Sequence, residues 1–130
     1  MTFNADTKVF LFRNGAASPF HNMAIDEALL EKSRLLEDCL LLRFYSWSTP
    51  CVSFGYTQRY TDVAAGAGGL PVVRRPTGGG VVHHGDDFTY SAVIPPGSVF
   101  FSMNRRAIYI FFHAAIAGAL KRLKVSVTDK

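Results

Sequence analysis

The feature that most limits the fold of this chain is a run of three consecutive glycines at positions 78–80. Glycine loses more conformational freedom on folding than any other residue, so such a run is unfavourable inside a helix or strand. Valine pairs on both sides of the run favour extended structure. The sequence therefore predicts a loop between two strands, at 72–75 and 81–84.

Other segments have the composition of strands and loops. Apolar and β-branched residues predict strands at 8–12, 39–47, 51–56 and 88–94. Asn-Gly and Ser-Pro pairs predict a loop at 14–22, and a glycine- and alanine-rich segment predicts another at 64–71. The residues at 125–127 resemble the first half of a further strand.

Two long helices are expected. The first begins after a cap at Asn22 and runs through residue 37. Its predicted apolar stripe consists of Ala24, Ile25, Ala28, Leu29, Leu35 and Leu36, with Asp26, Glu27 and Glu31 on the opposite side and Met23 and Leu30 off the stripe. The second follows a cap at Asn104, with apolar residues at 108, 111, 112, 115, 116, 119 and 123. The order strand, helix, several strands, helix predicts an α+β fold, with a mixed or mainly antiparallel sheet flanked by the two helices.

Composition narrows the class of protein. A chain of 130 residues, 48% of them hydrophobic, suits one globular domain. The net charge of +4 suits an anionic ligand, but the cations are too scattered for a nucleic-acid-binding strip. The two cysteines, Cys39 and Cys51, are expected to be buried apolar residues. No signal peptide or membrane-spanning segment is evident, so we expect a cytoplasmic protein with no membrane or nucleic-acid partner.

The glycine run is a candidate anion-binding loop. Without side chains, backbone N–H groups can approach a ligand closely, although a tight hairpin would also use glycine. The spacing of a phosphate-binding P-loop is absent. Arg74 and Arg75 precede the run and should point to opposite faces of their strand. Arginine is suited to bidentate binding of phosphate or carboxylate.

The polar residues after the loop do not form a convincing metal site. His83 and His84 also alternate in direction along their strand, whereas zinc needs several convergent ligands. Asp86 and Asp87 are expected to form a turn, although a magnesium role is left open. We therefore expect no bound metal ion.

Three ordered motifs resemble the lipoate–protein ligases and octanoyltransferases, whose catalytic fold is shared with the biotin–protein ligases. The central motif is RRPTGGGVVHHGDDFTYS, and it follows LRFYSWSTPCVSFGYTQ at 42–58. The segment NMAIDEALLE at 22–31 resembles the first helix of that family. The resemblance covers the chain from about residue 8 onward. It implies a biotin/lipoate ligase type of catalytic fold that is incomplete.

The resemblance also implies roles for particular residues. Arg75 would contact an acyl-adenylate, and the N–H groups of Gly78, Gly79 and Gly80 would bind its carboxyl–phosphate linkage. The other implied site residues are Val82, Trp47 and Met23 in the wall of an acyl tunnel, His84 after the glycine loop, and Asp26 as the acid of the first helix.

The activity implied first is ATP-dependent activation of lipoate or octanoate, with Mg²⁺, to an acyl-adenylate. The acyl group would then pass to a lysine on the lipoyl carrier domain of 2-oxoacid dehydrogenase or glycine cleavage proteins. Gly80 favours this ATP-dependent ligase activity, because cysteine-dependent octanoyltransferases tend to have arginine at that position. The alternative is transfer of octanoate from an acyl carrier protein.

The sequence departs from the family after the second long helix. The family's catalytic lysine lies in a Gly-Lys-Lys context that is not found here, so the catalytic residue is unknown and enzymatic activity is uncertain. We expect residues 1–130 to be the N-terminal part of the catalytic domain, without its later catalytic segment or C-terminal domain. A second subunit or a second copy could complete it. A truncated acyl-binding module without catalytic activity is the remaining alternative.

Overall fold

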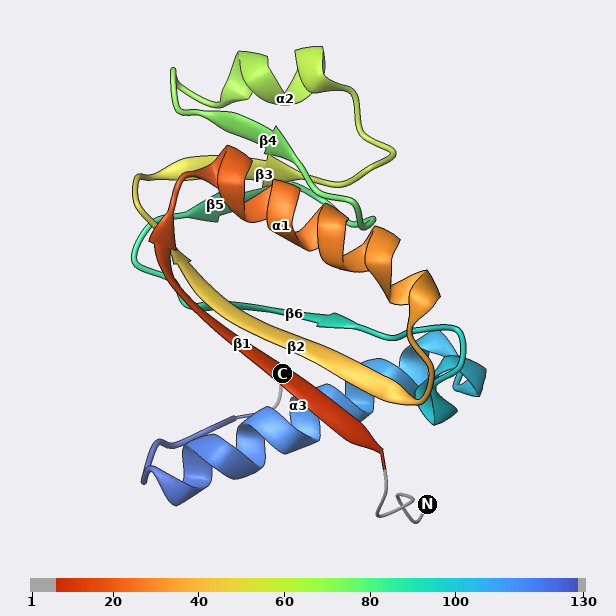
Figure 1. The fold of residues 1–130 in the computed structure, drawn as a ribbon. Helices are drawn as coiled ribbons and strands as arrows, with labels where there is room; N and C mark the ends of the chain where they lie inside the picture. The colour runs from red at the N-terminus through yellow and green to blue at the C-terminus, as the bar shows by residue number, and fades with distance from the viewer. Residues whose placement is uncertain (1–6, 129–130) are drawn as a thin grey trace. The chain divides into compact units, whose positions relative to one another are not determined.

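The computed structural model describes residues 7–128 (Figure 1). The chain divides into two compact units, Met1–Ser98 and Val99–Lys130. We describe each unit by itself, because the candidate site lies in the first.

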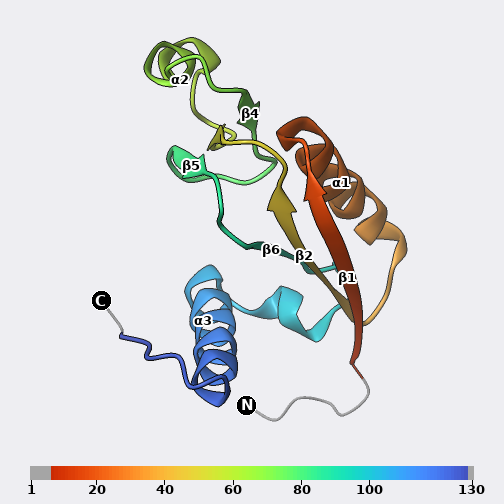
Figure 2. The same cartoon turned by 90° about the vertical axis from the view of Figure 1, so that its left-hand side faces the viewer.

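The first unit contains two small mixed sheets (Figure 2). One has the order β1-β2-β6, with β1 parallel to β2 and β6 antiparallel to it. The other has the order β4-β3-β5, with β4 parallel to β3 and β5 antiparallel to it. The strand bounds are β1 (Lys8–Ala17), β2 (Cys39–Trp47), β3 (Cys51–Phe54), β4 (Val72–Arg74), β5 (Val82–His84) and β6 (Thr89–Val93). The predicted α+β class with mixed strand pairing is confirmed.

The first helix begins earlier than the sequence predicts. Strand β1 continues to Ala17, and helix α1 spans Pro19–Lys32, followed by the 3₁₀ turn η1 (Ser33–Leu35). Ser18 is the N-cap, and its hydroxyl accepts a hydrogen bond from the His21 amide at 3.2 Å. Proline suits the first helical position because its missing N–H would have no partner there. The predicted loop at 14–22 and the Asn22 cap are therefore wrong.

The cap gives the first testable expectation. Replacing Ser18 with alanine should lower the free energy of unfolding by about 1 kcal/mol, because the helix loses an N-cap acceptor. Urea unfolding followed by the fluorescence of Trp47 measures this. An unchanged midpoint would show that the hydrogen bond contributes nothing to stability.

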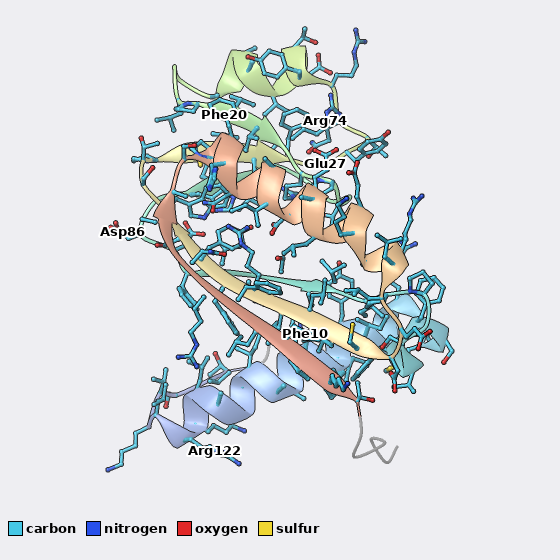
Figure 3. All side chains as sticks on the ribbon, in the orientation of Figure 1. Phe10, Phe20, Glu27, Arg74, Asp86 and Arg122 are labelled. Carbon is cyan, nitrogen blue, oxygen red and sulfur yellow. The ribbon has the colours of Figure 1, made fainter. Side chains whose placement is uncertain are left out.

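The buried face of α1 also differs from the predicted stripe. Ala24 and Ala28 are exposed, whereas Asn22, Met23 and Asp26 are buried. Apolar periodicity missed this face because two of its residues are polar and are buried only where they have partners. Glu27 on the same helix is exposed (Figure 3).

The segment predicted as a loop at 64–71 is helical in part. Helix α2 spans Tyr60–Gly66. It packs through Val63 and Ala67 against Val52 and Phe54 of β3. Short helices owe their stability mainly to such packing, so their local sequence signal is weak.

The second unit is mainly helical. It contains the 3₁₀ turn η2 (Val99–Ser102) and helix α3 (Arg105–Arg122). Asn104 caps α3 by accepting a hydrogen bond from the Ala107 amide at 2.9 Å, as the sequence predicts. Residues 125–127 are not in a strand, so that prediction is wrong. Among residues 7–128, no helix is long and apolar enough to span a bilayer.

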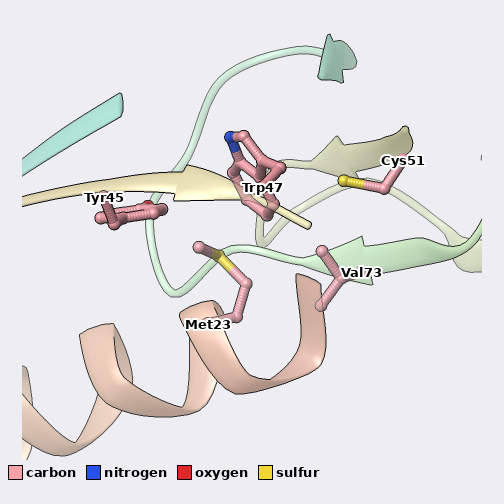
Figure 4. Packing of buried hydrophobic residues seen from close by; sticks show 5 residues of the cluster. All are labelled: Met23, Tyr45, Trp47, Cys51 and Val73. Carbon is pink, nitrogen blue, oxygen red and sulfur yellow. The ribbon is translucent and has the colours of Figure 1, made fainter. Parts of the chain in front are cut away.

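An apolar cluster between α1 and the two sheets forms the centre of the first unit (Figure 4). Its members are Met23, Tyr45, Trp47, Cys51 and Val73. Cys39 and Cys51 are both buried free thiols, which confirms the prediction. Burial, with a smaller contribution from Asp87, raises the pKa of Cys51 to about 11. A thiol that remains protonated is a weak nucleophile.

Candidate functional site

The glycine loop is held in a defined conformation by Arg75. One guanidinium nitrogen of Arg75, Nη2, donates to the carbonyl oxygens of Gly78 at 3.1 Å and Gly80 at 2.8 Å. Gly79 between them has a φ of 98°, which a residue with a side chain rarely adopts. Within residues 7–128, the N–H groups of the three glycines donate no hydrogen bond. Two carbonyl groups of the loop therefore face the Arg75 guanidinium, and its N–H groups remain available to bind a ligand.

Gly55 lets the loop lie directly against the end of β3. A Cβ atom at Gly55 would overlap the carbonyl oxygen of Gly79 and come within 2.9 Å of the Gly78 carbonyl carbon. This is a contact between two backbones, so neither side can rotate away. The close approach requires glycine at position 55.

Arg74 and Arg75 have different partners. Arg74 donates to the carbonyl oxygens of Tyr56 at 2.6 Å and Gln58 at 2.8 Å, whereas Arg75 reaches the glycine loop. The segment after β3 is fixed further by a hydrogen bond from the Gly55 amide to the Gln58 side chain at 3.0 Å. One arginine thus orders each of the two adjacent loops.

Arg75 is also hydrogen-bonded to strand β3. Its Nη1 donates to the hydroxyl oxygen of Ser53 at 2.8 Å. Burial lowers the pKa of Arg75 from its usual value, with an opposing smaller effect of Tyr45. Arginine remains protonated in proteins, so the site keeps a partly buried positive charge.

His84 connects Ser53 to Asp87. The His84 ring lies with Nε2 2.7 Å from the Ser53 hydroxyl and Nδ1 2.8 Å from an Asp87 oxygen. Asp87 also accepts from the Gly85 amide at 2.8 Å and from Thr89 at 3.1 Å. Burial raises the pKa of Asp87, but these hydrogen bonds, the one with His84 first among them, outweigh it, so the pKa is below its ordinary value.

Sequence reasoning did not find Ser53, and it assigned Asp87 to a turn, with a magnesium role left open. Ser53 lies within a short apolar strand, inside the motif at 42–58, but nothing in its immediate sequence marks it as a site residue. Its hydrogen bond to His84 spans a separation of 31 residues and exists only because β3 and β5 pair. No signal in the sequence alone could have identified it.

The three residues expected to line an acyl tunnel do not share one environment: two are buried and one is exposed. Met23 and Trp47 belong to the buried apolar cluster, and the Trp47 ring stacks on His84 with 4.1 Å between the ring centroids. Val82 lies on β5 and its side chain is exposed. The apolar cluster therefore adjoins the polar group of His84 and Ser53.

Asp26 lies in a separate buried network. One carboxylate oxygen accepts from Arg43 at 2.7 Å and from Ser91 at 2.8 Å, and the other accepts from the Tyr45 hydroxyl at 2.9 Å. Burial and the charge of Asp26 raise the pKa of Tyr45 well above its usual value, so its hydroxyl remains a donor. Both oxygens of Asp26 are thus occupied inside the protein.

Together these contacts describe a site with free amide donors, one fixed guanidinium and an adjacent apolar cluster. Such a set can bind an oxygen-rich or carbonyl-bearing head group attached to an apolar chain. Among residues 7–128, no group of three or more His, Cys, Asp or Glu side chains could hold a metal ion.

Comparison with known families identifies the class of domain. The family model described as the lipoyl protein ligase A/B catalytic domain matches residues 18–130. The chain belongs to the family of lipoyl protein ligase A/B catalytic domains.

The similar curated relatives are octanoyltransferases. Octanoyltransferase LipM of Moorella thermoacetica is 38% identical over 121 residues, which is 90% of this chain and 44% of the relative. That of an Exiguobacterium species is 46% identical over 89 residues, 65% of this chain and 32% of the relative. The chain therefore spans less than half the length of these relatives.

Solved structures confirm the fold. A lipoate protein ligase from Thermoplasma acidophilum, determined as a bi-partite ligase with its E2 lipoyl domain, matches with a TM-score of 0.69 and 22% identity over 95% of this chain and 49% of that chain. Lipoate-protein ligase A bound with ATP matches with a TM-score of 0.64 and 23% identity, over 94% of this chain and 51% of that chain. The predicted biotin/lipoate ligase type of fold is therefore confirmed, and this chain corresponds to 49% and 51% of those two structures.

Proposed function

We propose that this chain is the acyl-binding part of an octanoyltransferase that acts without ATP. The observation that supports this proposal most directly is the glycine loop, whose three N–H groups donate no hydrogen bond within residues 7–128, while the carbonyl oxygens of Gly78 and Gly80 accept from Arg75. Amide donors of this kind stabilise negative charge that develops on the carbonyl oxygen of a thioester. The similarity to octanoyltransferases supports transfer over the ATP-dependent ligase reading.

The site residues divide into two groups in this proposal. Gly78, Gly79 and Gly80 bind the acyl carbonyl, and Arg75 fixes their orientation and supplies positive charge. The apolar chain lies against Met23, Trp47 and Val82, next to His84, and each buried CH₂ contributes about 0.8 kcal/mol. Asp26 is a structural residue in this proposal, because its oxygens are already bonded.

The remaining steps require more of the catalytic domain than residues 1–130 contain. We propose that this chain forms the N-terminal part of the domain, because it spans 44% of a relative that it matches over 90% of its own length. Further polypeptide, in the same chain or a second subunit, would supply the nucleophile. The acceptor would be a lysine of a lipoyl carrier domain.

Titration calorimetry with an octanoylated acyl carrier protein tests this proposal, with the unacylated carrier protein as reference. We expect binding that requires the octanoyl group and needs neither ATP nor Mg²⁺. Arg75→Ala should weaken it at least tenfold, because charge-assisted hydrogen bonds contribute about 1.5–3 kcal/mol each.

Arg59→Ala is the matched control, since Arg59 is exposed and its side chain makes no hydrogen bond within residues 7–128. This variant should bind as the unmodified protein does. The proposal is contradicted if octanoyl carrier protein does not bind. Binding of lipoate only in the presence of ATP would instead support ATP-dependent ligase activity.

A further inference from the structure

A continuous chain of hydrogen bonds runs from Asp87 to the arginine that holds the glycine loop. It passes from Asp87 to His84, from His84 to Ser53, and from Ser53 to Arg75, with distances of 2.8, 2.7 and 2.8 Å. The residues come from β3, β5, the end of β4 and the turn after β5. Only the pairing of β3 with both neighbouring strands brings them together (Figure 1).

The chemistry of the end groups fixes the direction of this chain. A guanidinium can only donate, so the Ser53 oxygen accepts from Arg75. Ser53 is completely buried, and an unpaired hydroxyl proton there would be unfavourable, so that proton is donated to His84 Nε2. His84 then carries its own proton on Nδ1 and donates it to the Asp87 carboxylate.

Further contacts restrain His84. Thr89 accepts from the Trp47 indole at 3.0 Å and donates to Asp87 at 3.1 Å, while the Trp47 ring stacks on the imidazole. The titratable groups near His84 are Asp87 in the following turn, Cys51 opposite it on β3, and Arg75 beyond Ser53. Of these three groups, Asp87 both bonds to the ring and carries negative charge.

We propose that Ser53, His84 and Asp87 are positioning residues that hold the Arg75 guanidinium in place through this directed relay. The proposal deepens the proposed function, because Arg75 in turn orders the acyl-binding glycine loop. Ser53 has the neighbours of a catalytic serine, but its side chain is fully buried and already accepts from Arg75. Its role is therefore to transmit position.

Asp87→Asn should reverse the direction of donation along this chain of hydrogen bonds. The Gly85 amide must still face an oxygen, so the NH₂ group of the substituted side chain would face His84 Nδ1 and donate to it. His84 would then carry its proton on Nε2 and donate to Ser53, which would receive two donors and leave its own proton unpaired. Asp86→Asn is the control, because the neighbouring Asp86 is exposed and makes no side-chain hydrogen bond within residues 7–128.

The tautomer of His84 can be read from ¹⁵N chemical shifts of histidine-labelled protein, with the His84 signal assigned by its loss in His84→Gln. We expect the Nδ1–H form in the unmodified protein and in Asp86→Asn, and the Nε2–H form in Asp87→Asn. Affinity for octanoylated carrier protein should fall about tenfold in Asp87→Asn and remain unchanged in Asp86→Asn, the size expected for loosening one charged contact. Amide spectra of both variants should keep the native dispersion.

The tautomer measurement needs no ligand, so the two proposals fail in different ways. An Nε2–H form in the unmodified protein would overturn the relay whatever binds. A reversed tautomer without loss of affinity would also overturn it and leave the proposed function intact. If the unmodified protein binds no octanoyl carrier protein, the proposed function fails, and the expected tautomer reversal would still support the directed hydrogen bonds from Ser53 through His84 to Asp87.

Discussion

Replacement of Asp26 with alanine is expected to lower the free energy of unfolding by about 3–5 kcal/mol, because it leaves a buried cation without its counter-charge. The Arg43 side chain is 0% exposed, and its Nη1 donates to an Asp26 carboxylate oxygen at 2.7 Å. Domains of this kind have a total stability of only about 5–15 kcal/mol, so the loss is a large fraction of it. Urea unfolding followed by the fluorescence of Trp47, the single tryptophan, measures the effect.

Glu27→Ala is the matched control for this prediction. Glu27 is the adjacent acid on the same helix but is exposed, so its replacement should change stability by less than about 0.5 kcal/mol. The double variant Asp26→Ala with Arg43→Met should recover part of the loss, because no unpaired charge remains. Equal destabilisation by Asp26→Ala and Glu27→Ala would show that the buried ion pair contributes no more to stability than an exposed acid does.

Gly55→Ala is expected to have the largest effect on binding. The added methyl group would overlap the Gly79 carbonyl oxygen, and a positive φ at Gly79 gives the loop little freedom to adjust. Overpacking of this kind costs about 1–3 kcal/mol. The glycine loop should move away from β3, and affinity for octanoylated carrier protein should fall at least tenfold.

Gly66→Ala tests whether this effect is specific. Gly66 lies in α2, and a Cβ atom there would meet nothing within 4 Å. The substitution should leave binding unchanged and should stabilise the helix slightly, by about 0.5–1 kcal/mol. Normal affinity in Gly55→Ala would show that the position of the glycine loop against β3 is unimportant for the ligand.

Local patterns were sufficient for some elements and insufficient for others. The second long helix, its cap at Asn104 and most of the strands have a periodic or composition signal within a few consecutive residues. The first helix was placed too late, because Asn22 is a good capping residue whose side-chain NH₂ group instead donates to the carbonyls of Ala17 and Ser46. The short helix α2 was missed, because its stability comes from packing on β3.

The sequence by itself determined the glycine loop with its two arginines, the α+β class and the burial of both cysteines, because these follow from properties of residues close together in the chain. Only the tertiary structure decided which polar groups meet. Arg43 with Asp26, and Ser53 with His84, are partners across separations of 17 and 31 residues. Buried polar groups are stable only when such partners are present, and strand pairing and helix packing determine which partners those are.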